Sequence, residues 1–387
     1  MLSIEIQMSL LLFTAFVGYL IATKLKQTAI VGQILVGILI GPSLLALITY
    51  TDFVQNLAYL GAVVLLFVIG LEFKIKEIFN LKYGIIALIG VLIPFISGFF
   101  LAEAFQYPFT SAVFIGAAFT ATSVTITAKV LQELGKLQTD VARAIIGAAV
   151  IDDILGILVL SFSVQVDSGS LSVIPILIII IKATLFVVLG ALIGSMFLNK
   201  LLQRFDGTVC VKKCPDIMFI GAMTIAFLYA MVAELIGLSA IVGAFLAGMC
   251  LSGIIVRQGK NFKEGADYLQ IIFGAIFFVA LGILVDIKGL TGQIVIFIIV
   301  LTVLAILTKL VGCYLGAKLG GMHHKDSLIV GVGMIPRGEV AMIVALIGLN
   351  LQIIQQDIYV SIISMSLLTT LLVPFILTPL LNHRKNL

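Results

Sequence analysis

The sequence AVIDDILG, residues 149–156, places two neighbouring carboxylates, Asp152 and Asp153, inside an apolar segment. Residues 144–150 and 154–160, on either side of the pair, are all apolar or glycine. One ionised aspartate at the centre of a bilayer costs roughly 2.5–3.5 kcal/mol on insertion scales. A pair in such a setting is therefore expected to have a function that requires it.

The composition indicates that the setting is a membrane. The chain has 387 residues, of which 61% are hydrophobic and only 11% are charged, whereas soluble domains carry about 25% charged residues. Runs of about 20 apolar residues, each long enough to cross a bilayer, recur along the whole length. We therefore expect an all-α polytopic membrane protein.

Breaks in hydropathy divide the chain into thirteen predicted transmembrane helices. Their approximate ranges are 4–23, 28–47, 54–73, 83–105, 110–131, 138–163, 171–199, 216–236, 238–253, 267–286, 290–317, 326–348 and 357–381. Residues 1–387 are expected to form a single membrane unit without a soluble domain, because the longest inner loop, near residues 200–215, is too short to fold alone.

The basic residues predict the orientation. With the N-terminus outside, 19 of the 23 Lys and Arg residues fall in loops and ends on the inner side. Lys288 falls on the outer side, and Lys182, Lys309 and Arg337 fall within spans. The positive-inside rule then predicts a multi-pass protein of the cell membrane with a cytoplasmic C-terminus. A basic inner face suits anionic membrane lipid and requires no nucleic acid.

An internal repeat links the two halves of the chain. TAIVGQILVG at residues 28–37 returns as SAIVGAFLAG at residues 239–248. These segments lie in spans two and nine, which cross in opposite directions. The pattern predicts two six-helix inverted-topology repeats, about 4–163 and 216–381, joined by a connector helix at about 171–199. Such repeats build transporters, with the substrate site near the midplane, often on interrupted helices.

Spans five and twelve, which the repeat pairs, both carry signs of an interruption. Span twelve contains MIPRGEV, residues 334–340, where Pro336 removes a backbone donor and Gly338 loosens the turn. Span five contains TATSVTIT, residues 120–127, whose hydroxyls can satisfy carbonyls that a break would free. The alternative for span five is an ordinary helix whose Ser and Thr side chains bond to their own backbone.

The charges within the spans need partners. Adjacent helical residues point about 100° apart, so one aspartate can face a fixed cation while the other lines a wet cavity. Lys309 with one aspartate makes a neutral pair, and the other aspartate is left to bind a proton or a metal ion. Arg337 and Glu339 flank the break in span twelve, either as a structural clamp or as lining of an ion path. Lys182 has no evident partner, so snorkelling or a lipid contact is expected.

Four motifs resemble the monovalent cation/proton antiporters, in particular the two-aspartate, NapA-like sodium/proton antiporters. These motifs are LLFVIGLEF at residues 65–73, FTATSVTIT at 119–127, IDDILG at 151–156 and RGEVAMIV at 337–344. They occur in the expected order, and the resemblance extends over essentially the whole chain. The Asp-Asp pair, followed by a lysine five spans later, is the most specific part of the resemblance.

The resemblance implies a homodimer in which a moving core (transport) domain works against a static dimerisation domain. It implies that Asp153 binds proton and sodium in turn, that Asp152 pairs with Lys309, and that Thr122 and Ser123 lie at the crossover of the interrupted helices. Sodium would be held by Asp153 with help from Asp152. No cofactor is implied, because the transported sodium and protons are substrates.

The same resemblance favours one function. Potassium-efflux relatives carry Gln-Asp and electroneutral relatives carry Asn-Asp where this chain has Asp152-Asp153. We therefore expect a secondary transporter, not an enzyme, that exchanges sodium or lithium for protons electrogenically by an elevator-type movement. The alternatives are a potassium/proton antiporter or another sodium-coupled transporter of related fold.

Two further classes fit the sequence poorly. An intramembrane aspartyl protease needs two carboxylates facing each other from different helices, whereas Asp152 and Asp153 are adjacent on one. An ion channel can also use inverted repeats and broken helices. A carboxylate balanced by a buried lysine suits stoichiometric exchange better than rapid conduction.

Overall fold

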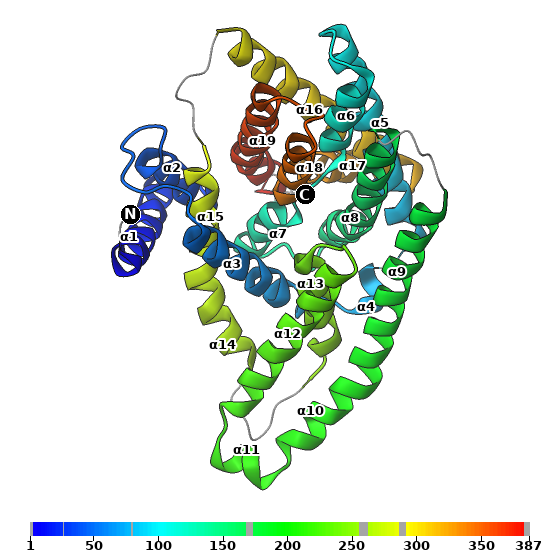
Figure 1. Cartoon of the computed structure of the whole chain (residues 1–387). Helices are drawn as coiled ribbons and strands as arrows, with labels where there is room; N and C mark the ends of the chain where they lie inside the picture. The colour runs from blue at the N-terminus through cyan, green and yellow to red at the C-terminus, as the bar shows by residue number, and fades with distance from the viewer. Residues whose placement is uncertain are drawn as a thin grey trace.

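The computed structural model describes residues 3–25, 27–78, 80–167, 173–254, 262–285 and 292–382 (Figure 1). Over these residues, every regular element is a helix. Ten helical segments are long and apolar enough to cross a bilayer, and three shorter apolar helices accompany them within the same residues. The predicted class, an all-helical membrane protein, is confirmed.

The helices follow the predicted order. The first part of the chain forms α1 (Ile4–Leu25), α2 (Ala29–Ile40), α3 (Asp52–Gly70), α4 (Ile75–Ile78), α5 (Leu81–Ala104), α6 (Phe109–Thr120), α7 (Val124–Glu133) and α8 (Asp140–Asp167). The middle forms α9 (Val173–Leu192), η1 (Ile193–Leu198), α10 (Asn199–Asp206), α11 (Val209–Lys213), α12 (Ile217–Leu235) and α13 (Ala240–Leu251). The last part forms α14 (Phe262–Leu269), η2 (Gln270–Gly274), α15 (Ala275–Ile283), α16 (Gly292–Leu319), α17 (His324–Gly333), α18 (Glu339–Asn350) and α19 (Gln356–Asn382).

Each of the thirteen predicted ranges coincides with one of these helices or with consecutive ones. Two ends differ by seven residues. The helix that begins with α9 continues through α10 to Asp206, beyond the predicted end at 199, and in the range 28–47 α2 ends at Ile40. Pro42 follows directly after Gly41, which is extended at φ −69° and ψ −177°, and a residue before proline is driven away from the helical conformation. The predicted ranges 171–199 and 290–317 begin on residues outside the described parts of the chain.

Most of these helices pack into two groups. The chain passes between the groups several times, and α9 is one of the connections. The α2 group contains α1, α2, α3, α12, α13, α14, η2 and α15, and the α6 group contains α5, α6, α7, α8, α16, α17, α18 and α19. In Figure 1 the α6 group occupies the upper part of the view, and the α2 group lies to its left and below it. Each group draws helices from both halves of the chain.

Glycine contacts hold the α2 group together, and they come in two corresponding pairs. A Cβ on Gly37 of α2 would lie 2.3 Å from the Val279 carbonyl oxygen and 3.0 Å from the Gly282 Cα of α15. A Cβ on Gly248 of α13 would lie 2.2 Å from the Phe67 carbonyl oxygen and 2.9 Å from the Gly70 Cα of α3. Any larger residue would separate these helices, so both crossings depend on glycine.

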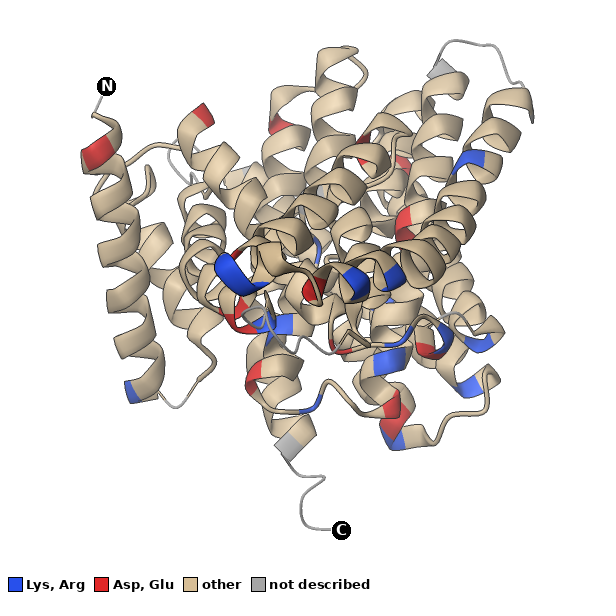
Figure 2. Cartoon of the chain, turned by 90° about the horizontal axis from the view of Figure 1, so that it is seen from below, with Lys and Arg blue, Asp and Glu red and all other residues tan. Residues whose placement is uncertain are grey.

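The charged residues are unevenly distributed over the fold. Figure 2 shows the Lys and Arg positions concentrated toward one side of the molecule, the lower side in that view. The opposite side carries mainly acidic positions. Lys26, Arg257, Lys260, Lys288, Arg384 and Lys385, which also enter the predicted charge distribution, lie outside the described residues.

Candidate functional site

Two interrupted helices meet in the α6 group. Residues 121–123 separate α6 from α7, and residues 334–338 separate α17 from α18. The Ser123 backbone N–H donates to the Pro336 carbonyl at 2.8 Å, and the Thr127 hydroxyl donates to the Gly333 carbonyl at 2.6 Å. Both predicted interruptions are therefore present, and the ordinary-helix alternative for span five is wrong.

The side chains predicted at the crossover lie there. Thr122 and Ser123 are both buried. The Thr122 hydroxyl lies 3.5 Å from the Met334 carbonyl, and the Ser123 hydroxyl lies 2.7 Å from that of Thr125. A Cβ on Gly338 would approach the Ser123 Cβ to 2.5 Å, so glycine at 338 permits the two breaks to cross closely.

Lys309 and Asp152 form an ion pair inside the α6 group. The Lys309 ammonium donates to Asp152 Oδ1 at 2.9 Å and to the Thr120 carbonyl at 2.7 Å. The two charged side chains are 0% and 1% exposed, respectively. Thr120 is the last residue of α6, so the lysine joins α8 and α16 to the carbonyl end of an interrupted helix. This end carries partial negative charge, which a cation stabilises.

The second oxygen of Asp152, Oδ2, is also buried, but it accepts no hydrogen bond from the described residues. A buried carboxylate oxygen without a partner is costly. Asp152 is therefore half-satisfied by Lys309, and the remaining oxygen is available to a further donor or cation.

Arg337 is fully buried within the break. Its guanidinium donates to the Ile335 carbonyl at 3.2 Å and to the Ala305 carbonyl at 3.3 Å. Its backbone N–H donates to the Thr369 hydroxyl, and its carbonyl accepts from the Thr370 hydroxyl. These contacts tie the break to α16 and α19, as a structural clamp would. Glu339 begins α18, but its side chain lies outside the described part of the structure.

Asp153 faces away from this ion pair, toward a cavity. The cavity has a volume of about 140 Å³ and is lined by Asp153, Gly156, Ile157, Leu160, Gly237, Leu238, Ser239, Val340, Ile343 and Val344. Asp153 is 8% exposed, and among the described residues it is the only titratable side chain that lines the cavity. The two aspartates thus have different surroundings, as the 100° separation predicts.

The cavity lies between the two helix groups. Its α8 and α18 residues belong to the α6 group, whereas residues 237–239 form the turn between α12 and α13 of the α2 group. Gly237 has a φ of +89°, a conformation that glycine adopts without strain. The predicted ranges 216–236 and 238–253 place a turn here, but its position in the lining of the cavity was not predicted, because that position depends on how distant segments pack.

On the other side of Asp153, the two groups are in contact. Gly156, Ile157 and Leu160 follow Asp153 along α8 into the cavity, whereas α7 packs against α2 and α3 near the beginning of α8. There Glu133 Oε2 accepts from the Ala29 backbone N–H at 3.0 Å. The Gln132 and Gln270 side-chain amides also bond to each other, at 2.9 and 3.3 Å.

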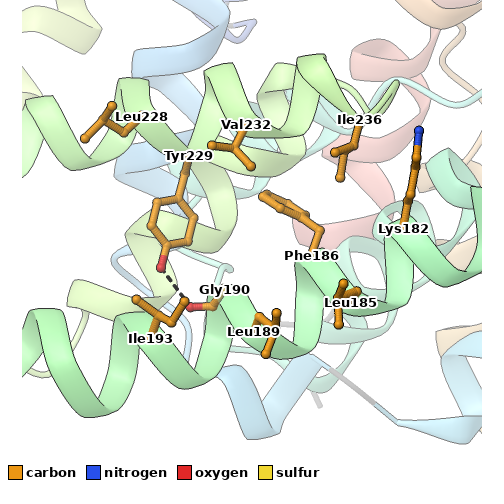
Figure 3. Close-up of a pocket in the computed structure, with 10 residues that line it drawn as sticks. All are labelled: Lys182, Leu185, Phe186, Leu189, Gly190, Ile193, Leu228, Tyr229, Val232 and Ile236. Carbon is orange, nitrogen blue, oxygen red and sulfur yellow. Dashed lines mark hydrogen bonds between the residues drawn. The ribbon is translucent and has the colours of Figure 1, made fainter.

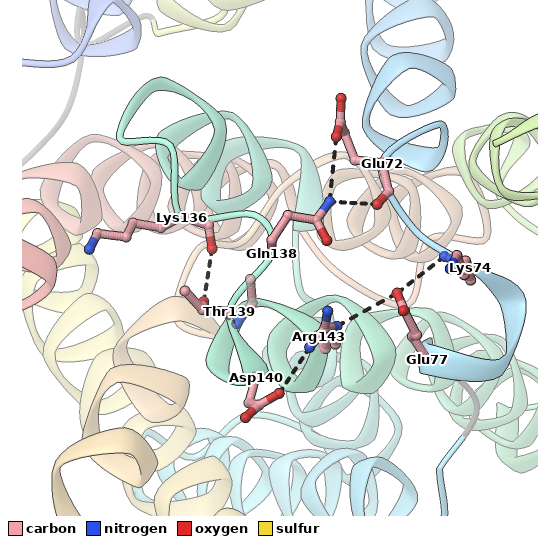
Figure 4. A network of polar contacts seen from close by, with 9 residues as sticks. Glu72, Lys74, Glu77, Lys136, Gln138, Thr139, Asp140 and Arg143 are labelled. Atoms are coloured by element: carbon pink, nitrogen blue, oxygen red, sulfur yellow. Dashed lines mark hydrogen bonds and ion pairs between the residues drawn. The ribbon is translucent and has the colours of Figure 1, made fainter. Parts of the chain in front are cut away.

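A polar network extends this closed side (Figure 4). Gln138, in the turn before α8, donates to the Glu72 carbonyl at 2.7 Å, and the Glu72 carboxylate also pairs with Lys263 of α14. Arg143 of α8 lies 3.6 Å from Glu77 of α4. Surface pairs of this kind are each worth little, but together they join the turn before α8 to the segment after α3, and α8 to α4.

This arrangement defines a class of protein, namely a membrane transporter with interrupted helices that cross beside a buried carboxylate. The family model described as "Sodium/hydrogen exchanger, transmembrane" matches residues 11–383. The chain therefore belongs to the sodium/hydrogen exchanger family. Members of this family are secondary transporters rather than enzymes, and they use no cofactor because the ions are substrates.

Relatives and solved structures agree with the family. The chain is 36% identical to a Na+/H+ antiporter of Enterococcus hirae, over 95% of each chain. It is 32% identical to the Na+/H+-K+ antiporter GerN of Bacillus cereus, over 95% of this chain and 94% of the relative. Its fold matches the sodium proton antiporter MjNhaP1 of Methanocaldococcus jannaschii with a TM-score of 0.73 and 21% identity, over 97% and 96% of the two chains. The expected antiporter resemblance is confirmed.

Proposed function

We propose that this chain exchanges sodium, and lithium by the same chemistry, for protons at Asp153. The observation that carries the proposal is the position of Asp153, in a cavity between the two helix groups. The Asp153 carboxylate can bind either a proton or a sodium ion, but not both at once, because protonation removes the negative charge that holds the cation. Sodium is a hard cation that prefers oxygen ligands, and the hydroxyls and carbonyls near the crossover at Thr122 and Ser123 supply them.

Asp152 and Lys309 form the second part of the proposed site. In this scheme Asp152 helps Asp153 to neutralise the bound sodium ion, because Asp152 Oδ2 has no partner among the described residues. Lys309 then releases its proton, because the Asp152 charge that stabilises its ammonium is shared with sodium. Lys309 and Asp152 therefore titrate as a coupled pair. Arg337 holds the crossover as a clamp throughout the cycle, and Glu339 remains a candidate for the ion path.

The coupling makes the exchange electrogenic. If two protons exchange for one sodium ion, one net charge crosses the membrane in each cycle. A charge moved across about 150 mV is worth about 3.5 kcal/mol, which sustains a sodium gradient of several hundredfold. Lys309 is therefore the residue on which the proposed stoichiometry depends.

The proposed movement is an elevator-type displacement of the α6 group as the core domain. The α2 group would be the static dimerisation domain of a homodimer, since its glycine contacts fix its helices to one another. The corresponding contacts, Gly37 with Gly282 and Gly248 with Gly70, support two inverted repeats. In the proposed topology of thirteen crossings, with the N-terminus outside and the C-terminus cytoplasmic, the α12–α13 turn is on the outer side. The cavity at Asp153 then opens outward while α7 closes the inner side.

The test is purified protein in liposomes that contain a pH-sensitive dye. Sodium added outside should drive proton movement that saturates with concentration, and lithium should replace it. Sodium-dependent flux without proton movement would point to another sodium-coupled transporter and would overturn the proposal.

Potassium is the second candidate, because the relative from Bacillus cereus is named as a Na+/H+-K+ antiporter. The same liposomes challenged with potassium chloride separate the two. A response to potassium equal to the sodium response would assign the chain to both ions.

A further inference from the structure

An apolar groove runs between α9 and α12, outside the site described above. It has a volume of about 490 Å³. The groove walls include Leu185 and Leu189 from α9 and Leu228 and Val232 from α12, and these four side chains are 41–52% exposed. Among the described residues that line the groove, Lys182 is the only charged one (Figure 3).

The described residues on the floor of this groove offer no free polar group. Phe186 and Tyr229 lie with their rings 6.3 Å apart in an edge-on arrangement. The Tyr229 hydroxyl donates to the Gly190 carbonyl at 2.8 Å, so both polar atoms are already used. The groove is therefore suited to a hydrocarbon chain, which needs contact and no hydrogen bonds.

Lys182 stands at one end of the groove, beside Ile236 and at the opposite end from Tyr229 (Figure 3). Its side chain is exposed, and no ion pair or hydrogen bond joins it to the rest of the described chain. Positions 182 and 200 are 18 residues apart on the continuous helix from α9 to α10, which is about 27 Å along the axis. Lys200 directly follows the predicted span 171–199, whereas residues 173–181, which precede Lys182, are all apolar. Lys182 therefore lies inside the span, toward its outer end, and its side chain can extend toward the headgroups.

We propose that the groove binds an anionic phospholipid. One acyl chain lies between α9 and α12 over Phe186, and the headgroup phosphate pairs with the Lys182 ammonium at the membrane surface. A lipid satisfies both features at once, because a lysine at this depth extends toward the headgroups and the apolar walls need a long apolar occupant. A second copy of the chain would have to supply an acidic partner for Lys182 as well as the apolar surface.

The position of the groove ties a bound lipid to the transport site. Ile236 lines the groove, and the next three residues, 237–239, line the cavity at Asp153. A lipid in the groove therefore packs against the same turn that forms the α2-group wall of the ion cavity. The proposal itself concerns binding, so it stands or falls independently of the transported ion.

The test measures lipid retention by the purified full-length protein with native mass spectrometry, and the thermal shift that added lipid produces. The probes are phosphatidylglycerol, phosphatidylcholine and glycerol phosphate. We expect a discrete phosphatidylglycerol adduct, with weaker retention of phosphatidylcholine and no effect of glycerol phosphate. Lys182→Gln should weaken phosphatidylglycerol binding about fivefold, since one lysine near an anionic headgroup contributes about that much.

Two further variants complete the design. Lys200→Gln removes a charge at the other end of the same helix and should leave the adduct unchanged. Leu189→Trp fills the groove and should lose both lipids, and its exposed position lets the variant fold. Equal binding by Lys182→Gln and wild type, equal retention of both lipids, or a full effect of glycerol phosphate would each overturn the proposal. A change from dimer to monomer in Lys182→Gln and Leu189→Trp, without a change in lipid retention, would assign the groove to a second copy and also overturn it.

Discussion

The Lys309 ammonium lies 2.9 Å from Asp152 Oδ1, and both side chains are almost completely buried. Lys309 is thus neutralised on one side by a carboxylate and held on the other by the Thr120 carbonyl. Asp152 is less well satisfied, because Oδ2 has no partner within the described chain. In the proposed exchange, this remaining oxygen is the one through which Asp152 helps to neutralise the bound sodium ion.

Lys309→Gln should lower the thermal stability and reduce the charge moved per sodium ion. Removing one partner of a buried ion pair costs about 3–5 kcal/mol, because the remaining charge is left uncompensated. The measurements are a thermal melt and the current on a supported membrane after a sodium jump. Residual exchange is compatible with this scheme, since Asp153 is unchanged.

A double variant, Asp152→Asn with Lys309→Gln, is the matched control for this prediction. It removes both charges and should recover part of the lost stability, but not the current. Unchanged current and unchanged melting in Lys309→Gln would show that the lysine takes no part in the cycle.

Asp153→Asn should abolish exchange while the protein stays folded. The amide is nearly isosteric, but it neither titrates nor carries charge, so it can bind neither of the competing ions. Exchange is measured in dye-loaded liposomes, and folding is checked by the melt. Asp140→Asn is the control, since Asp140 is on the same helix with an 89% exposed side chain paired with Arg143, and it should keep wild-type exchange. Sodium-driven proton flux in Asp153→Asn at the wild-type rate would refute the assignment.

Much of this site could be predicted because its determinants are local. Each of its signals lies in a short stretch of sequence. These signals are the hydropathy of each span, Pro336 in one break and the hydroxyls around Ser123 in the other. The different directions of Asp152 and Asp153 follow from helix geometry alone. The end of α2 at Ile40 could also have been predicted, since Pro42 marks it.

The remaining features depend on contacts between distant segments. The turn at residues 237–239 lines the Asp153 cavity only because the fold places it across the cavity from α8 and α18. Arg337 is equally compatible with a clamp and an ion path in the sequence, and its contacts with the Ile335 and Ala305 carbonyls become visible only when α16 is in place. Neither arrangement leaves a periodic pattern in the chain.

Gly338→Ala should damage the crossover. The added Cβ would lie 2.5 Å from the Ser123 Cβ, so the two breaks must move apart. Misplacement of the groups around a reacting site by about 1 Å can cost up to a hundredfold, and we expect a loss of exchange of about tenfold or more, with a lower melting temperature. Gly84→Ala in α5 is the control, because nothing lies within 4 Å of its added Cβ. Wild-type exchange and melting in Gly338→Ala would show that the breaks do not need this close approach.

A covalent bond between the two helix groups should stop transport and leave sodium binding intact. Gln132 of α7 and Gln270 of η2 are joined by side-chain hydrogen bonds of 2.9 and 3.3 Å, and they belong to opposite groups on the closed side of the site. Replacing both with cysteine, in a background without the exposed Cys210 and Cys214, permits a bifunctional thiol cross-linker to span the space that the two glutamine side chains occupied. Because the Asp153 cavity is on the other side of the contact, sodium can still enter it and stabilise the protein against heat.

Tyr59 and Glu234 supply the matched control, since their 2.8 Å hydrogen bond joins α3 to α12 within one group. That pair, cross-linked in the same way, should retain exchange. Full turnover in a completely cross-linked Gln132–Gln270 sample would show that the two groups do not move past each other at this contact.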